Sequence, residues 1–146
     1  MKKTILILSL IATLLVISYF FVQRKENKVE NFAIELVDNA IPLEQVLKKR
    51  INYSEKQKDL CLFFLKTIRK EYNKNPEKIK VISASEHAKF SDKNRIKLYD
   101  GEHLFYIQFN KSLTLPFIVN KKSQIIILFY LTKGGGGNLK NSRSDD

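Results

Sequence analysis

Three residues in the sequence have the side chains of a thiol–imidazole catalytic pair: Cys61, His87 and His103. A cysteine nucleophile needs a histidine base within hydrogen-bond distance and access to substrate. Cys61 instead lies inside the apolar stretch CLFFL, where cysteine usually behaves as a small hydrophobic residue. We therefore expect Cys61 to fill the core and predict no catalytic residue.

The two histidines each follow a glutamate, in the pairs Glu86-His87 and Glu102-His103. Two histidines and two carboxylates on neighbouring strands would have the donor types of a metal site. Their spacing matches no HExxH motif, and both pairs fall near predicted strand ends, where solvated polar residues are usual. We expect neither a metal nor a cofactor.

An excess of positive charge is the strongest functional signal. The chain has 26 Lys and Arg against 15 Asp and Glu, and residues 45–80 alone hold eleven cations against four acids. Such a surface suits anionic lipid headgroups, and a solvated helix face is the plainer alternative. Nucleic acid is not expected, because no binding module is recognised. The candidates for anionic-surface contact are Lys48, Lys49, Arg50, Lys66, Arg69 and Lys70.

Residues 4–22, TILILSLIATLLVISYFFV, form a run of 19 residues without a charge. As a helix this run is ~28 Å long, close to the hydrocarbon thickness of a bilayer. No small-x-small cleavage site ends it. The run predicts a single-pass signal anchor over residues 1–22, favoured over a cleaved signal, with an extracytoplasmic domain. Basic residues flank it on both sides: Lys2, Lys3, Arg24, Lys25 and Lys28.

Helical spacing predicts two or three helices after the run. A short apolar stripe lies in residues 27–39, and Pro42 suits the first turn of a helix over 43–50. Ser54 is a good N-cap for a longer helix that ends near Asn73. Its apolar positions recur every three or four residues: Leu60, Cys61, Phe64, Leu65, Ile68 and Tyr72.

After Pro76 the apolar period changes from helical to alternating, which predicts strands. Asp100-Gly101 is a hairpin-turn signal, and the four glycines from Gly134 predict a joint that leads into a flexible polar tail, residues 134–146. The predicted strands are 78–85, 95–99, 102–109, 113–120 and 124–132.

Both faces of the predicted sheet are apolar. A sheet with one wet side should be polar on its second face, yet alternation places Leu104, Tyr106, Ile126 and Leu128 there. We expect this face to be covered, either by the segment 32–46 or by curvature of the sheet itself.

The sequence thus predicts one α+β domain over residues 23–133, with two or three helices packed on a curved antiparallel sheet of four or five strands. This element order resembles the cystatin-like and nuclear-transport-factor-2-like architectures, which implies a sheet that curls around a pocket or a dimer surface. Two functions follow as hypotheses. The first is a non-enzymatic, membrane-anchored binding module that uses the sheet for an unidentified protein partner or for self-association. The alternative is a small pocket-bearing enzyme or ligand carrier. In both, the expected binding residues are Tyr106, Gln108 and Tyr130.

Overall fold

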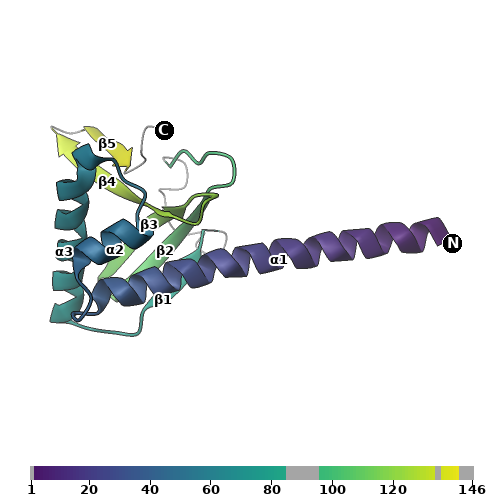
Figure 1. The fold of residues 1–146 in the computed structure, drawn as a ribbon, viewed down its shortest axis with the longest axis horizontal. Coiled ribbons are helices and arrows are strands. Elements are labelled where there is room, and N and C mark those ends of the chain that lie inside the picture. The colour runs from purple at the N-terminus through teal and green to yellow at the C-terminus, as the bar shows by residue number, and fades with distance from the viewer. Residues whose placement is uncertain (1, 85–95, 134–135, 142–146) are drawn as a thin grey trace.

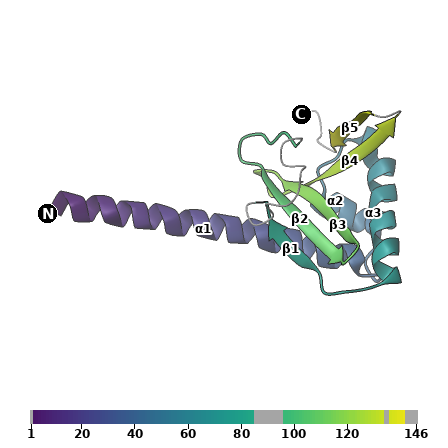
Figure 2. The same ribbon diagram turned by 180° about the vertical axis from the view of Figure 1, so that it is seen from behind.

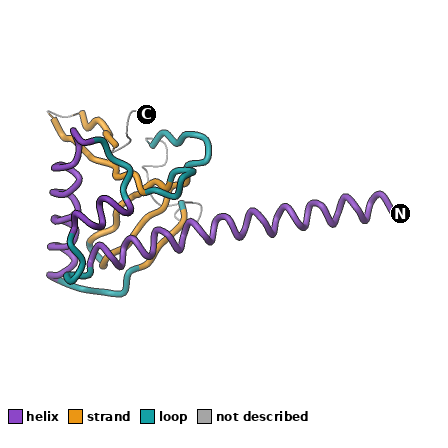
Figure 3. Tube along the Cα trace, viewed as in Figure 1, coloured by secondary structure: helices purple, strands orange, loops and turns teal. Residues whose placement is uncertain are grey.

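The computed structural model describes the backbone of residues 2–84, 96–133 and 136–141, and the side chains of residues 7, 9–20, 23–84 and 96–128. Over this part of the chain the fold is α+β, as predicted, with three α-helices followed by an antiparallel sheet (Figures 1 and 3). The elements are α1 (Lys2–Val37), α2 (Leu43–Arg50), the 3-10 turn Glu55–Gln57, α3 (Lys58–Lys74), β1 (Lys80–Ser83), β2 (His103–Asn110), β3 (Leu113–Val119), β4 (Ile125–Lys133) and β5 (Gly136–Asn141).

The longest element is α1, which runs for 36 residues from the N-terminal apolar run into the domain without a break. Its sequence contains neither proline nor glycine, so no residue in it interrupts the helical hydrogen bonds. Near its C-terminal end Val29, Phe32, Ala33 and Leu36 are fully buried, which is the spacing of one helix face. The N-terminal half projects away from the domain (Figure 1).

Among the helices, taken over the residues that the structure describes, none has a stretch that is both long and apolar enough to cross a membrane. In the predicted membrane segment, residues 4–22, the side chains at both ends, those of residues 4–6 and 21–22, lie outside the part that the structure describes. The signal anchor therefore stays a prediction from the sequence.

The sheet is a simple meander in the order β1-β2-β3-β4-β5, with every neighbouring pair antiparallel. The helices pack on one of its faces, and Figure 2 shows the sheet in front of α1 and α2. At the centre of this layer the ring of Phe32 meets Phe117 edge-on, with 5.4 Å between centroids. The strand residues of this core are Phe105, Ile107, Phe109, Phe117, Val119, Ile125 and Ile127.

The second face of the sheet is also covered, as predicted, because Ile126 and Leu128 are only 1% and 4% exposed. Of the two expected covers, the segment 32–46 was wrong, because it supplies residues to the helix-side core instead. Among the described residues, Ile96 is the one outside the sheet that is buried in this second cluster. The predicted strand 95–99 is also wrong over its described residues, since 96–99 form a loop, and the apolar side chain of Ile96 packs onto the sheet.

The glycine-rich segment differs from the predicted joint and tail. Gly136–Asn141 form β5, which pairs with β4 from Lys133 opposite Gly136 to Leu128 opposite Asn141. A strand ladder is made by main-chain groups alone, so residues without side chains can still take part in it. Residues 134–135 and 142–146 lie outside the described part of the chain.

The buried second face gives a direct test. Ile126→Asp should lower the free energy of unfolding by about 3 kcal/mol or more, because it places a carboxylate in an apolar cluster. The matched change Phe63→Asp alters a side chain that is 69% exposed on α3 and should stay within about 0.5 kcal/mol of the parent. Chemical denaturation measures both. Equal stability of the two variants would show that the second face is not internal.

Candidate functional site

The residues predicted to bind through the sheet are not presented to solvent as a patch. Tyr106 and Gln108 lie two positions apart on β2, where they pair with Pro116 and Thr114 of β3. Tyr106 is only 1% exposed and Gln108 is half-buried. Tyr130 lies in β4, and its side chain is outside the described set. Because Tyr106 is enclosed, a partner cannot reach it without movement of the cover, and the binding role of the three residues stays a prediction.

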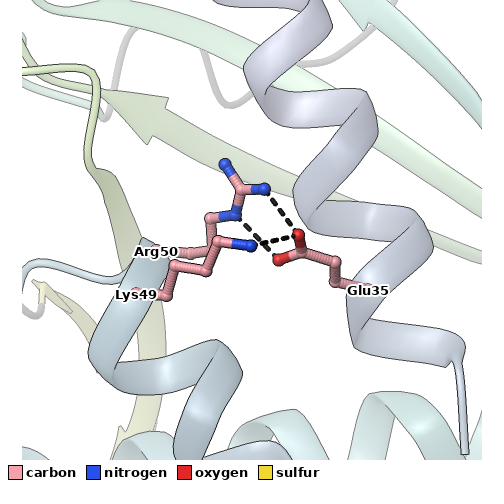
Figure 4. Close-up of polar contacts among 3 residues, drawn as sticks. All are labelled: Glu35, Lys49 and Arg50. Carbon is pink, nitrogen blue, oxygen red and sulfur yellow. Dashed lines mark hydrogen bonds and ion pairs between the residues drawn. The ribbon is translucent and has the colours of Figure 1, made fainter. Parts of the chain in front are cut away.

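The predicted cationic cluster divides into two groups. Lys48, Lys66 and Lys70 are exposed. Lys49 and Arg50 of α2 instead hold Glu35 of α1, as Figure 4 shows, with Lys49 Nζ 2.8 Å and Arg50 Nη2 2.6 Å from Glu35 Oε1. Arg50 Nε donates a further bond of 2.8 Å to Oε2. Hydrogen bonds from Arg50, helped by Lys49, lower the pKa of Glu35 to about 2.

Arg69 of α3 also has a structural contact. Its Nε donates to the carbonyl of Leu36 at 2.6 Å, and its Nη2 donates to the carbonyl of Ile41 at 2.9 Å. The last carbonyls of a helix lack intrahelical donors, and a cation there also favours the helix dipole. Half of the predicted cluster therefore fastens the end of α1 to α2 and α3, and its contact with an anionic surface stays a prediction.

The residues with catalytic or metal-binding chemistry are dispersed. Cys61 is fully buried, and burial raises the pKa of its thiol to about 11. Burial, with a smaller effect of the Lys25 charge, lowers the pKa of His103. His87 and Glu86 lie outside the described residues. Within the described ranges, no three His, Cys, Asp or Glu side chains come close enough to hold a metal ion.

The structure brings together a different set of cations around a hollow of about 360 Å³. This volume falls within the range of small-molecule sites, about 300–1,000 Å³. One wall comes from α1, directly after the apolar run, and the other from the turn between β3 and β4. The lining residues are Arg24, Lys25, Lys28, Lys121, Lys122 and Ser123. We call this the cationic hollow.

The turn that forms the second wall is held by its own polar residues. The amide of Ser123 donates to the carbonyl of Asn120 at 2.9 Å, and the amide of Gln124 donates to Asn120 Oδ1 at 2.9 Å. Ser123 has a φ of 63°, a left-handed conformation that closes a tight turn. Lys121 and Lys122 therefore stand at the tip of a fixed hairpin.

A third segment, the turn at Gly101, connects the two walls. Lys25 Nζ donates to the carbonyl of Gly101 at 2.8 Å. A Cβ on Gly101 would lie 3.0 Å from the Cβ of Lys121, closer than neighbouring side chains normally pack. Gly101 also has a φ of 75°, which favours glycine. Glycine at this position thus permits α1, the turn that precedes β2 and the β3–β4 turn to meet.

The charge of the cationic hollow is one-sided. Five of its six lining residues are cations, and none of the lining residues, all in the described part of the chain, is an acid. Burial lowers the pKa of Lys25, since a charged ammonium loses hydration there. Like charges gathered around one hollow repel one another, and a bound anion relieves this repulsion.

Sequence reasoning did not find this site. Arg24, Lys25 and Lys28 were expected to flank the apolar run, and Lys121 and Lys122 fall between the predicted strands 113–120 and 124–132. The two groups are more than ninety residues apart along the chain, and no periodicity links them. Only the packing of α1 along the sheet brings them together.

Comparisons of the chain with protein-family models, with curated proteins and with solved structures found no match.

The ion pair of Glu35 predicts a loss of stability in acid. The folded-state pKa of about 2 lies below the ordinary value of 4.5, so the pair stabilises the fold above pH 4.5 and is lost as the pH falls toward 2. Glu35→Gln should lower the free energy of unfolding at pH 7 by about 1–2 kcal/mol and flatten its dependence on pH between 4.5 and 2.

Glu71→Gln is the matched control. The Lys74–Glu71 pair lies within α3, and both side chains are more exposed than that of Glu35, so the change should have less than about 0.5 kcal/mol of effect. Urea unfolding at several pH values measures both variants. An unchanged pH profile in Glu35→Gln would contradict the role of the pair.

Cys61 should resist thiol reagents in the folded protein. With a pKa of about 11, only about a thousandth of the thiol is ionised at pH 8, and the side chain is fully buried. Labelling should proceed only after addition of denaturant, as mass spectrometry of the intact chain would show. Cys61→Ser should destabilise more than Cys61→Ala, because serine buries a hydroxyl. Rapid labelling without denaturant would refute the core assignment.

Proposed function

We propose that the protein is a non-enzymatic, membrane-anchored accessory module that binds an anionic ligand at the membrane surface. Residues 4–22 insert into the bilayer, the domain lies on the extracytoplasmic side, and the cationic hollow is the binding site. One observation carries the proposal: the hollow begins at Arg24, immediately after the uncharged run and on the same unbroken helix.

The exposure of the apolar run supports the anchor. Its described large side chains are 47–65% exposed on all sides of the helix, and α1 projects away from the domain there (Figure 1). A helix that is apolar all round and not packed against its own domain needs an apolar environment. The side chains concerned are Ile7, Leu10, Ile11, Leu14, Leu15, Val16, Ile17, Tyr19 and Phe20.

The layout of charge supports the extracytoplasmic side. Lys2 and Lys3 stand directly before an uncharged run, which is the pattern of an export signal. Positive residues at both ends leave the orientation nearly balanced by charge counting alone. Protease treatment of intact and opened cells tests the orientation. An extracytoplasmic domain should be digested when protease is added to intact cells. Digestion only after the cells are opened would place the domain in the cytoplasm.

The architecture is consistent with this function. Helices followed by a β meander resemble the cystatin-like or nuclear-transport-factor-2-like order, and we propose that the domain is of this kind. The resemblance implies a pocket or dimer surface on the curled sheet, where the alternative enzyme or carrier would place Tyr106 and Gln108. Tyr106 is enclosed on that face and offers no open pocket to a substrate. The cationic hollow lies elsewhere, between α1 and the β3–β4 turn. These two observations favour the binding module over the enzyme or carrier.

Insertion of the run can be tested in the full chain. Replacing Leu14 and Leu15 by arginine places two charges at the centre of the run, each costing about 2.5–3.5 kcal/mol in a bilayer. The parent should remain in the membrane pellet after alkaline carbonate, and this double variant should be released. Arginine at the exposed Leu60 and Phe63 of α3 adds the same charge and should leave the chain in the pellet. Release of the parent, or retention of the Leu14/Leu15 variant, would refute the anchor.

A further inference from the structure

The cationic hollow can be assigned an occupant, because it lies beside a loop that exposes two large apolar side chains, Leu98 and Tyr99. The carbonyl of Gly101 accepts a hydrogen bond from Lys25, and the loop that ends there carries Leu98 and Tyr99, which are 42% and 53% exposed. The ammonium of Lys97 lies 5.5 Å from the centroid of the Tyr99 ring. Cations beside exposed leucine and tyrosine are typical of surfaces that enter a lipid–water interface.

The distance of the α1 wall of the hollow from the end of the uncharged run agrees with a position at the lipid–water interface. From the end of the uncharged run at residue 22, the helical rise places Lys25 about 4.5 Å and Lys28 about 9 Å further along the axis. The headgroup region on each side of a bilayer is about 5–7 Å thick. When the run fills the hydrocarbon layer, Arg24 and Lys25 therefore lie at the level of the lipid phosphates, and Lys28 lies just beyond them.

The donors of the hollow suit a phosphate group. An ammonium has three donor hydrogens, and the bond to Gly101 uses one of those on Lys25. Arg24 adds a planar guanidinium, which matches phosphate oxygens in pairs. Lys121 and Lys122 approach from the opposite wall, so an anion between the walls would be contacted from both sides.

We propose that the cationic hollow seats the phosphate of an anionic phospholipid headgroup, with Leu98 and Tyr99 placed among the first carbons of the surrounding lipids. This inference rests on the membrane anchorage proposed above. It differs from a general attraction of a basic protein, because it assigns the contact to α1 and the β3–β4 turn. The exposed lysines of α3 face a different environment: α3 lies at the end of the domain away from the projecting half of α1 (Figure 1).

The test compares two double variants of the full chain that remove the same charge. Lys121→Ala with Lys122→Ala alters the hollow, and Lys66→Ala with Lys70→Ala alters exposed positions on α3. Each chain is reconstituted in phosphatidylcholine vesicles that contain a minor fraction of phosphatidylglycerol. After detergent extraction, native mass spectrometry counts the phosphatidylglycerol retained per chain. The Lys121/Lys122 variant should retain about tenfold less than the parent, and the Lys66/Lys70 variant should retain as much as the parent. Equal retention by the two variants would overturn the headgroup site.

Two further measurements distinguish a failure of the membrane anchor from a failure of the lipid site. Flotation of the parent with pure phosphatidylcholine vesicles reports anchorage alone, so a parent that does not float refutes the proposed function. Glycerol phosphate and inorganic phosphate carry the same anion without acyl chains. In excess, neither should displace the retained lipid. Displacement by either would show that the hollow takes its phosphate from solution and would overturn the lipid assignment.

Discussion

The arrangement of the whole molecule depends on α1 being one uninterrupted helix. Its first part is apolar on all sides, residues 23–28 are mainly polar, and its last part buries Val29, Phe32 and Leu36 against the sheet. Because a helix without proline or glycine bends little, the core contacts at one end fix the direction of the projecting end. The cationic hollow, built on the polar segment between them, therefore has a set distance from the apolar run.

Cations serve two distinct purposes in this protein. Lys49 and Arg50 bind the carboxylate of Glu35, and Arg69 donates to the carbonyl of Leu36 near the end of α1. These contacts hold α1 against α2 and α3. The cations of the hollow line a space in which the described lining residues include no acid. A paired cation stabilises the fold, whereas cations gathered without a carboxylate favour an external anion. The absence of a carboxylate among the described lining residues distinguishes the proposed site from the cluster that Lys49 and Arg50 form around Glu35.

The segment 96–102 links the core to the proposed site. Ile96 is buried against the second face of the sheet, Leu98 and Tyr99 are exposed, and the carbonyl of Gly101 holds Lys25. One short loop thus packs Ile96 on an apolar face, exposes two apolar side chains and bonds to Lys25 in the wall of the hollow. Its position is consequently set from both ends.

The sequence by itself determined the elements whose signals are local. Helical spacing and Pro42 predict α2 at the bounds that the structure has, alternation predicts β2, β3 and β4 to within a residue or two, and the stretch around Cys61 predicts its burial. Tertiary structure decided what each charge and each apolar face contacts: Glu35 with Arg50, Ile96 on the sheet, and Lys25 beside Lys121. Periodicity and turn chemistry act over a few residues, so they record which face of an element is apolar. They carry no information on which distant segment will lie against that face, because that choice is made by the packing of the whole chain.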